Sequence, residues 1–313
     1  MTEALTVAPN SLWLFFSAGI LVLLAIDLSL FGKGDKKVSS KKALLESGAW
    51  ICVALLFNAW FAYEYGSDLG LEFLTGYLVE KSLSVDNLFV ILLIFNSFKI
   101  PAGFQHRVLF FGILGAIVLR AFFIVIGAQL LHTFHWILYL FGFFLVATAV
   151  KFLRETDDHI NPEENFFLRL VKKAIPTTDD TSHNQFFVRE NGIRKATPLF
   201  LALIVIEFTD LVFAVDSIPA VFAVTQDAFV AFASNILAIL GMRALYFVIA
   251  DLVGKLRYLK PGLAVVLGFI GIKMLIIDFF KIPSWISLLV IIAILTTAGL
   301  SSWYVSKLES QRK

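Results

Sequence analysis

LFLALIVIEFTDLVFAVDSIPAVFAVT, residues 199–225, is long and apolar enough to cross a bilayer, yet it carries three acids. The acids are Glu207, Asp210 and Asp216. An ionised carboxylate near the centre of a membrane helix costs on the order of 3 kcal/mol even on a lenient insertion scale. Residues kept at such a cost are candidates for function, so the stretch predicts both a membrane helix and a site within it.

The composition of the whole chain agrees with a membrane protein. Its 313 residues are 59% hydrophobic and only 16% charged, with a mean hydropathy of +0.85, whereas soluble domains carry about 25% charge. The net charge of +2, without a dense basic tract, argues against a nucleic-acid partner. The single Cys52 excludes a disulfide framework within the chain. We therefore expect the lipid bilayer to surround most of the chain.

Apolar runs near the ~20 residues needed to span a bilayer recur along the sequence. They fall at residues 12–31, 43–64, 70–96, 107–129, 134–152, 198–225, 228–250, 262–280 and 284–305. The start, MTEALTVAPN, lacks the basic region of a cleaved signal peptide, so we expect the first run to be retained. These runs predict an all-α polytopic membrane protein with about nine transmembrane helices.

Basic residues in the loops predict the orientation of these helices. They gather after the first span (GKGDKKVSSKK, residues 32–42), after the third, fifth and seventh spans, and at the C-terminus. The alternate loops EYGSDLG, LLHTFH, TQD and DFFKIP are nearly free of Lys and Arg. The positive-inside rule then places the N-terminus outside and the C-terminus in the cytoplasm, in agreement with an odd number of spans.

The one long loop, residues 153–196, is polar and predicted to be cytoplasmic. Its segment FFVRENGIRKA, residues 186–196, has two short strand-like runs around Asn191-Gly192, which is a type I′ hairpin signal. The hairpin is interpreted either as a regulatory or gating element or as a simple tether, and the tether is favoured.

An internal repeat explains why acids recur in the apolar runs. EKSLSVDNLFV (residues 80–90) and DLVFAVDSIPAV (residues 210–221) each carry two acids six residues apart, and LRAFFIVIGA (119–128) matches MRALYFVIAD (242–251) in the following span. The third and sixth spans run in opposite directions across the predicted membrane. That is an inverted-topology repeat, which in many secondary transporters encloses a binding site near the bilayer midplane.

We predict a single membrane domain over residues 1–313 with this repeat at its core. The first repeat is predicted at 43–130 and the second at 134–255, the latter including the loop 153–196. Residues 10–32 and 261–306 are predicted to form accessory helices.

The spacing of the acids predicts two layers of carboxylates. Six residues on a straight helix separate two side chains by about 9 Å along the axis and about 120° around it. Glu80 and Asp216 are therefore expected a few ångströms outward of the midplane, and Asp86 and Asp210 a few ångströms inward. Glu207, one turn before Asp210, would extend the inner approach.

Neutral oxygens accompany the acids in both repeats. Pro219 removes a backbone donor and clashes with the carbonyl of Val215, so it predicts a kink that frees carbonyl groups beside Asp216. The other repeat offers Asn87 and Ser84 instead. Hard oxygen ligands of this kind suit Mg²⁺, Ca²⁺ or Mn²⁺ alike, rather than Cu⁺ or Zn²⁺. The predicted metal ligands are Glu80, Asp86, Asn87, Glu207, Asp210 and Asp216.

Basic side chains in the spans leave a structural alternative open. Arg120 and Arg243 could simply neutralise the acids, although five acids against two arginines leave an excess of negative charge. Lys273 reduces this excess and Asp27 adds to it. An arginine could also do both jobs, pairing with a carboxylate once the cation has left. These four residues are therefore assigned to charge pairing or coupling.

Several motifs resemble the TerC/Alx family of bacterial inner-membrane proteins, and most of all its Alx branch. They are GYLVEKSLSVDNLFV (76–90), FFGILGAIVLRAFF (110–123), FFVRENG (186–192), FAVDSIPAVFAVT (213–225), LGMRALYF (240–247) and GFIGIKMLIIDF (268–279). The resemblance implies a protein of the bacterial inner (plasma) membrane that exports Mn²⁺ and is built from inverted three-helix repeats. It also implies that the intramembrane acids named above bind the metal.

We therefore expect a secondary transporter without a cofactor, not an enzyme, that carries Mn²⁺ as substrate from cytoplasm to periplasm. Exporting two positive charges against 100 mV costs about 4.6 kcal/mol, which proton antiport through the carboxylates could supply. A facilitated leak down a large gradient is the other route. The alternatives are a membrane scaffold or chaperone with structural acids, and an intramembrane aspartyl enzyme, whose GxGD context is absent. The sequence does not identify a protein partner.

Overall fold

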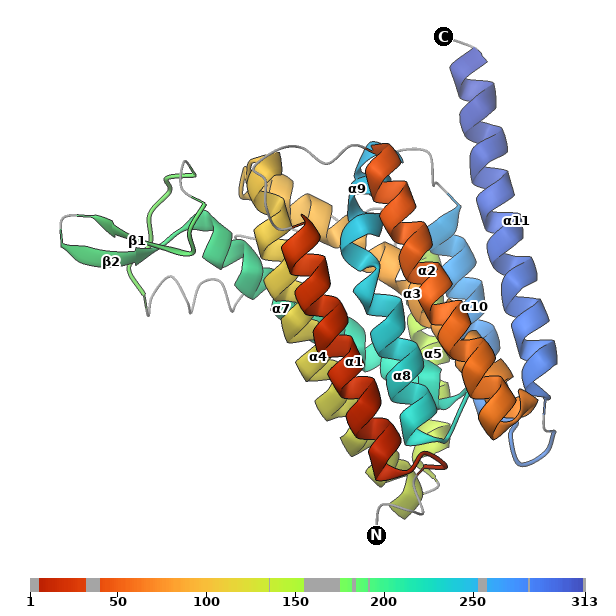
Figure 1. The fold of residues 1–313 in the computed structure, drawn as a ribbon. Coiled ribbons are helices and arrows are strands. Elements are labelled where there is room, and N and C mark those ends of the chain that lie inside the picture. Colours follow the sequence, from red (N-terminus) through yellow and green to blue (C-terminus); the bar gives the residue numbers. More distant parts are fainter. Residues whose placement is uncertain are drawn as a thin grey trace.

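The computed structural model describes residues 6–31, 40–134, 136–154, 175–181, 184–190, 192–252, 258–280 and 282–311. The described chain is helical apart from one β-hairpin (Figure 1). The helices are α1 (Asn10–Phe31), α2 (Ser40–Tyr65), α3 (Ser67–Ser97), α4 (Ala102–Thr133), α5 (Ile137–Arg154), α7 (Pro198–Phe222), α8 (Ala228–Leu240), α9 (Met242–Leu252), α10 (Leu259–Leu275) and α11 (Ser284–Gln311). The strands are β1 (Phe187–Glu190) and β2 (Ile193–Ala196).

The predicted class, an all-α polytopic membrane protein, is confirmed. Within the described residues, four helices are long and apolar enough to cross a membrane, namely Lys41–Tyr65, Ala102–Thr133, Pro198–Phe222 and Ser284–Val305, and α8 with α9 forms a fifth if the bent pair is one span. Each of the nine predicted spans coincides with a helix or with this pair. The N-terminal end of α1 and the C-terminal end of α11 lie at opposite ends of the bundle (Figure 1). The number of crossings and their direction stay predictions.

The helices of the two predicted repeats pack across each other. α3 packs against α8, and α4, which follows α3, packs against α7, while α3 and α7 also meet directly. Two copies of one helix pair that exchange partners would pack in this way. The repeat boundaries at 43–130 and 134–255 stay predictions.

Glycines allow α5 and α10 to approach closely. A Cβ atom added to Gly142 of α5 would lie 3.0 Å from the carbonyl oxygen of Gly271 in α10, and one added to Gly271 would lie 2.8 Å from the carbonyl oxygen of Gly142. Small residues that bring helix backbones together favour association in membranes, where van der Waals packing replaces the hydrophobic effect. α10, which belongs to a predicted accessory region, is therefore packed closely on α5 of the second predicted repeat.

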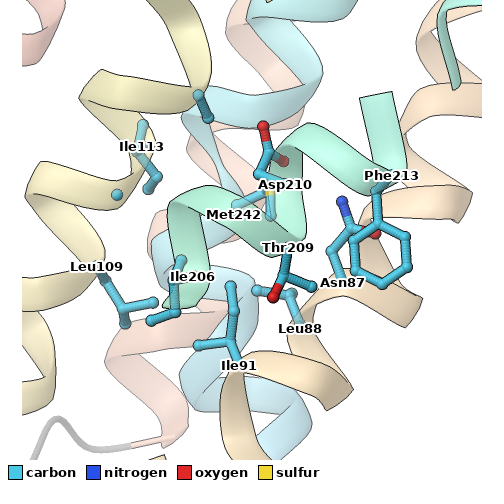
Figure 2. A pocket seen from close by; sticks show the side chains of 12 residues that line it. Asn87, Leu88, Ile91, Leu109, Ile113, Ile206, Thr209, Asp210, Phe213 and Met242 are labelled. Atoms are coloured by element: carbon cyan, nitrogen blue, oxygen red, sulfur yellow. The ribbon is translucent and has the colours of Figure 1, made fainter. Parts of the chain in front are cut away.

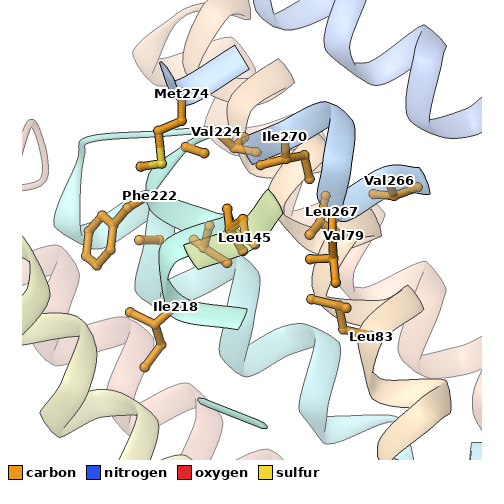
Figure 3. Close-up of a cluster of buried hydrophobic side chains, with 14 of the residues drawn as sticks. Val79, Leu83, Leu145, Ile218, Phe222, Val224, Val266, Leu267, Ile270 and Met274 are labelled. Carbon is orange, nitrogen blue, oxygen red and sulfur yellow. The ribbon is translucent and has the colours of Figure 1, made fainter. Parts of the chain in front are cut away.

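One cluster of buried apolar side chains joins α3, α5, α7 and α10 (Figure 3). Val79 and Leu83 of α3 lie beside Leu267 of α10, and Leu145 of α5 lies between them and the end of α7. The same cluster includes Phe222, the last residue of α7. Polar groups on α3 and α7 are therefore carried by helices whose positions are fixed by close packing.

The predicted span 228–250 is not one straight helix. It breaks at Gly241 into α8 and α9, which are bent by 43° relative to each other. A Cβ atom at residue 241 would lie 2.8 Å from Nζ of Lys81 and 3.1 Å from Cβ of Trp50. A side chain there would have to displace the Lys81 ammonium and press on Trp50, so glycine is favoured at this contact. Glycine also weakens the helix, so the same residue favours both the close contact and the break.

The hairpin predicted within the long loop is confirmed. β1 and β2 pair antiparallel, with Glu190 opposite Ile193, and Gly192 has a φ of 80°, which favours glycine. Asn191 lies outside the described residues, so the turn type stays a prediction.

The hairpin is anchored to the helices at one side of the bundle (Figure 1). Arg107 of α4 donates to the carbonyl oxygen of Asn184 and lies 5.3 Å from the ring centroid of Phe186. Thr197, just before α7, donates its hydroxyl to the carbonyl oxygen of Gln185 at 2.7 Å. This part of the loop is docked on α4 and α7, the helices that carry the site described next.

Candidate functional site

Arg120 lies at the centre of a buried polar cluster that joins three helices. Its side chain is fully buried in α4. The guanidinium donates through Nη1 to Glu80 Oε1 of α3 and, at 3.0 Å, to Ser217 Oγ of α7. Its Nη2 lies 3.2 Å from Asp210 Oδ1, also on α7. One cation therefore holds two of the predicted carboxylates together.

Asn235 of α8 completes this cluster and was missed by the sequence analysis, as was Ser217. The fully buried amide donates through Nδ2 to Glu80 Oε2 at 2.9 Å, and its Oδ1 accepts a long bond from Arg120 at 3.4 Å. A signal for Asn235 was present, because a polar residue in the middle of an apolar span is by default a functional candidate. Ser217 directly follows a predicted ligand, Asp216.

The cluster has one more carboxylate than guanidinium groups, and one carboxylate oxygen accepts no hydrogen bond from a described residue. If both carboxylates are ionised, Glu80 and Asp210 outweigh the single guanidinium of Arg120 by one charge. Oδ2 of Asp210 is buried and accepts no hydrogen bond from any group in the described part of the chain. Buried polar atoms are almost always paired, so an unpaired carboxylate oxygen marks a position where a cation or water would bind favourably.

Asp210 also lines a small cavity (Figure 2). Its volume is about 30 Å³, enough for one or two water molecules or a largely dehydrated ion. Asp210, Thr209 and Asn87 supply polar groups, and the other walls are mainly apolar. Further lining residues are Leu88, Ile91, Leu109, Gly112, Ile113, Ala116, Ile206, Phe213 and Met242, drawn from α3, α4, α7 and α9.

Glu207 lies one turn before Asp210 and is packed onto a glycine. A Cβ atom at Gly115 of α4 would be only 2.0 Å from Oε1 of Glu207, so the carboxylate occupies the space that a side chain would fill. Among the described residues Glu207 has no hydrogen-bond or ion-pair partner. A half-buried carboxylate without a partner in a membrane helix is costly, which favours a functional role.

The predicted separation of Glu80 and Asp210 into two layers is not observed. One guanidinium reaches both carboxylates, so they share a single site. The depth estimate assumed straight helices parallel to the membrane normal, and the packed helices need not obey it. Asn87 is buried and lines the cavity, and its assignment as a metal ligand stays a prediction.

Other predicted residues lie away from this cluster. Arg243 of α9 is buried with Nη1 3.4 Å from Nε2 of His106 in α4. Lys273 is buried in α10 and contributes neither to the Arg120 cluster nor to the cavity. Pro219 stands inside α7, which continues to Phe222, and the predicted kink stays a prediction.

Three predicted side chains lie outside the described part of the structure. The side chains of Asp86 and Asp216 are not described, although both residues stand in helices, α3 and α7, and the same holds for Asp27 in α1. Among the side chains that are described, no group of three or more His, Cys, Asp or Glu could hold a metal ion. Of the five acids assigned to the site, Glu80, Glu207 and Asp210 can therefore be placed.

Comparisons with known proteins place the chain in a family. It matches the family described as integral membrane protein TerC over residues 65–310. It is 47% identical to the uncharacterized membrane protein STKORF319 of Myxococcus xanthus over 302 residues, which cover 96% of this chain and 95% of that protein.

Two further relatives extend this likeness. Alx of Escherichia coli K12, whose name proposes a membrane-bound redox modulator, is 45% identical over 317 residues, covering 98% of this chain and 99% of Alx. An uncharacterized membrane protein of Rickettsia bellii is 43% identical over 283 residues, covering 90% and 94% of the two chains. No solved structure matches the chain. The family match, the relatives and the apolar helices agree: the chain is a multi-pass protein of the bacterial inner membrane and belongs to the integral membrane protein TerC family.

Proposed function

We propose that the protein is a secondary transporter that exports divalent metal cations, with Mn²⁺ as its main substrate, from cytoplasm to periplasm. The observation that carries this proposal is the buried, unpaired Oδ2 of Asp210, a residue that lines a small cavity and belongs to a cluster with two carboxylates and one guanidinium. A hard dication would satisfy this oxygen together with the amide oxygen of Asn87. The choice of Mn²⁺ among hard dications follows the resemblance to the TerC/Alx family.

In this proposal Arg120 acts as an internal counter-cation for the two carboxylates. Glu80 and Asp210 could not stay ionised and close together in the membrane without a positive charge. When a dication enters, it replaces the guanidinium at Asp210, and when it leaves, Arg120 returns. The site is thereby never left with two uncompensated carboxylates.

Glu207 supplies a first position for the incoming cation. Its unpaired carboxylate lies one turn before Asp210 on α7, against Gly115 of α4. Export of a dication against 100 mV costs about 4.6 kcal/mol, and protons that enter through the same carboxylates would supply that work. Because carboxylates can exchange a proton for a metal, the same groups would bind both ions.

Purified protein in liposomes tests the proposal. Wild-type protein is expected to move Mn²⁺ across the membrane when a pH gradient is imposed, and Mg²⁺ and Ca²⁺ serve as comparison ions. Asp210→Asn is expected to lower the rate at least about tenfold, which corresponds to about 1.4 kcal/mol in the barrier. Asp278→Asn, which changes an exposed acid outside the site, should leave the rate unchanged. Equal rates for wild type and Asp210→Asn, or no transport above empty liposomes, would contradict the proposal.

A membrane scaffold with structural acids is the second candidate, and the Arg120 cluster gives it specific support. An ion pair that ties α3, α4 and α7 together would also be expected in a purely structural core. Under that interpretation Asp210→Asn would lower stability, and no dication would be moved by the wild-type protein. The redox role proposed by the name of Alx would need chemistry other than an internal disulfide, since this chain has one cysteine.

A further inference from the structure

The break between α8 and α9 lies at the edge of the Asp210 cavity. Gly241 ends α8, and Met242, the first residue of α9, is one of the residues that line the cavity (Figure 2). A change in the 43° bend at Gly241 would therefore move Met242 relative to Asp210. Broken helices in transporters commonly line the path of the substrate, which makes this break relevant to access.

Lys81 holds the end of α8 at this break. Its ammonium donates to the carbonyl oxygen of Ala238 at 3.0 Å. The C-terminal end of a helix carries partial negative charge, so a cation there is stabilising. The ammonium also covers Gly241, where any Cβ atom would be 2.8 Å away from Nζ.

Two neighbouring residues of α3 form hydrogen bonds with α8. Glu80 accepts a hydrogen bond from Asn235, and the next residue, Lys81, donates to Ala238, which is almost one turn further along α8. Lys81 forms no ion pair with a described residue, so its bond to α8 is the polar contact that fixes it. The carboxylate cluster and the helix break are thus linked through neighbouring residues of one helix.

We propose that Gly241 is a hinge, that α9 with Met242 is a gate at the Asp210 cavity, and that Lys81 is the positioning residue that holds the gate in the observed arrangement. The gate rests on the proposed function, because it controls access to the carboxylates that would bind the cation. α9 also carries Arg243, which meets His106 near the start of α4. A swing of α9 would change that contact and the width of the cavity together.

Hydrogen exchange of the protein in lipid nanodiscs tests the hinge without reference to transport. Lys81→Met removes the ammonium and keeps much of the side-chain volume. We expect the backbone amides of residues 242–246 to exchange about tenfold faster in this variant, the size expected when one charge-assisted hydrogen bond is lost. Lys81→Arg, which keeps a charge and donors, should restore part of the protection. Lys42→Met, at an exposed lysine of α2, is the control and should exchange like wild type.

Transport of Mn²⁺ in liposomes then tests the gate. Lys81→Met is expected to lower the transport rate about tenfold, by the same factor as the increase in amide exchange. Mn²⁺ should still raise the unfolding temperature of this variant, because the carboxylates remain. Unchanged exchange in Lys81→Met would overturn the positioning role of Lys81. Faster exchange with a wild-type transport rate would overturn the gate. A wild-type protein that moves no dication would overturn the proposed function instead, and the exchange result would still decide whether Lys81 holds the hinge.

Discussion

Arg120 of α4 and Asp210 of α7 form a buried ion pair of 3.2 Å, although they stand in the two different predicted repeats. The same guanidinium binds Glu80 of its own predicted repeat. Charged groups at the midplane interface of two repeats are where inverted-repeat transporters bind their substrates. A movement of α4 relative to α7 would change this contact directly, so the pair connects helix packing with the occupancy of the site.

Removal of the Arg120 guanidinium should destabilise the protein and make its stability depend on metal. Arg120→Ala leaves Glu80 and Asp210 buried without their cation, which is expected to cost about 3–5 kcal/mol of unfolding free energy. Mn²⁺ should recover much of this loss, because a dication can take the place of the guanidinium. Thermal unfolding of the purified variant with and without Mn²⁺ measures both effects.

Two further variants show whether charge is the cause. Arg120→Ala combined with Glu80→Gln removes one excess carboxylate, so it should be more stable than Arg120→Ala alone. Arg154→Ala, at an exposed residue of α5, should match wild type. If Mn²⁺ stabilised wild type and Arg120→Ala by the same amount, the guanidinium and the metal would not share a site.

Gly115 should be required for transport because of the carboxylate packed against it. In Gly115→Ala the new Cβ atom would lie 2.0 Å from Oε1 of Glu207, so the carboxylate must move. We expect transport of Mn²⁺ in liposomes to fall about tenfold, which corresponds to a rise of about 1.4 kcal/mol in the activation barrier. Gly268→Ala is the control, because its Cβ would lie 3.6 Å from Cβ of Ala149, an ordinary contact. A Gly115→Ala variant as active as Gly268→Ala would remove Glu207 from the proposed path.

The hairpin should loosen in acid because of one carboxylate outside the membrane. Glu190 accepts hydrogen bonds from Lys195 and Thr178, each at 2.8 Å, and these bonds, that from Lys195 above all, hold its pKa below the ordinary value of 4.5. A carboxylate with a lowered pKa stabilises the folded form above its ordinary pKa, and that contribution is lost as the pH falls through the lowered value.

Backbone amide exchange in residues 187–196, corrected for its intrinsic pH dependence, measures this loss. Protection should fall in wild type between about pH 5 and about pH 3, across and below the ordinary titration range of a carboxylate. Glu190→Gln should show little change over the same range, because the amide does not titrate. Equal pH profiles for the two proteins would show that Glu190 does not secure the hairpin.

The features set by local sequence were predictable. Apolar runs of spanning length became helices, since in a membrane the backbone must satisfy its hydrogen bonds within the segment. Asn191-Gly192 between strand-like runs predicted the hairpin. The repeat singled out Glu80 and Asp210 as site residues. Their meeting at one guanidinium was not predicted, because the spacing of the acids placed them in different layers.

Features that depend on distant residues were not predictable. Asn235 is 155 residues from Glu80, and nothing in the sequence joins the two. Arg120 and Arg243 occupy equivalent places in the repeat, yet one binds the carboxylates and the other meets His106. The break at Gly241 also depends on tertiary contacts, because glycine is common in membrane helices and most such helices stay intact.

Gly241→Ala should disturb the same contact as Lys81→Met, by a different route. The new Cβ atom would be 2.8 Å from Nζ of Lys81 and 3.1 Å from Cβ of Trp50. The flexible ammonium gives way more easily than the tryptophan, so it should leave the carbonyl oxygen of Ala238. Exchange of the amides at residues 242–246 should then rise as it does in Lys81→Met.

The double variant decides whether the two changes act through one contact. If both act by removing the bond between Lys81 and Ala238, their effects on exchange should not add, because that bond can be lost only once. Gly19→Ala, whose Cβ would have no atom within 4 Å, controls for the effect of a methyl group on a membrane helix. Additive effects in the double variant would mean that Gly241 shapes α9 through Trp50 or its own backbone, and that Lys81 holds α8 independently of the hinge.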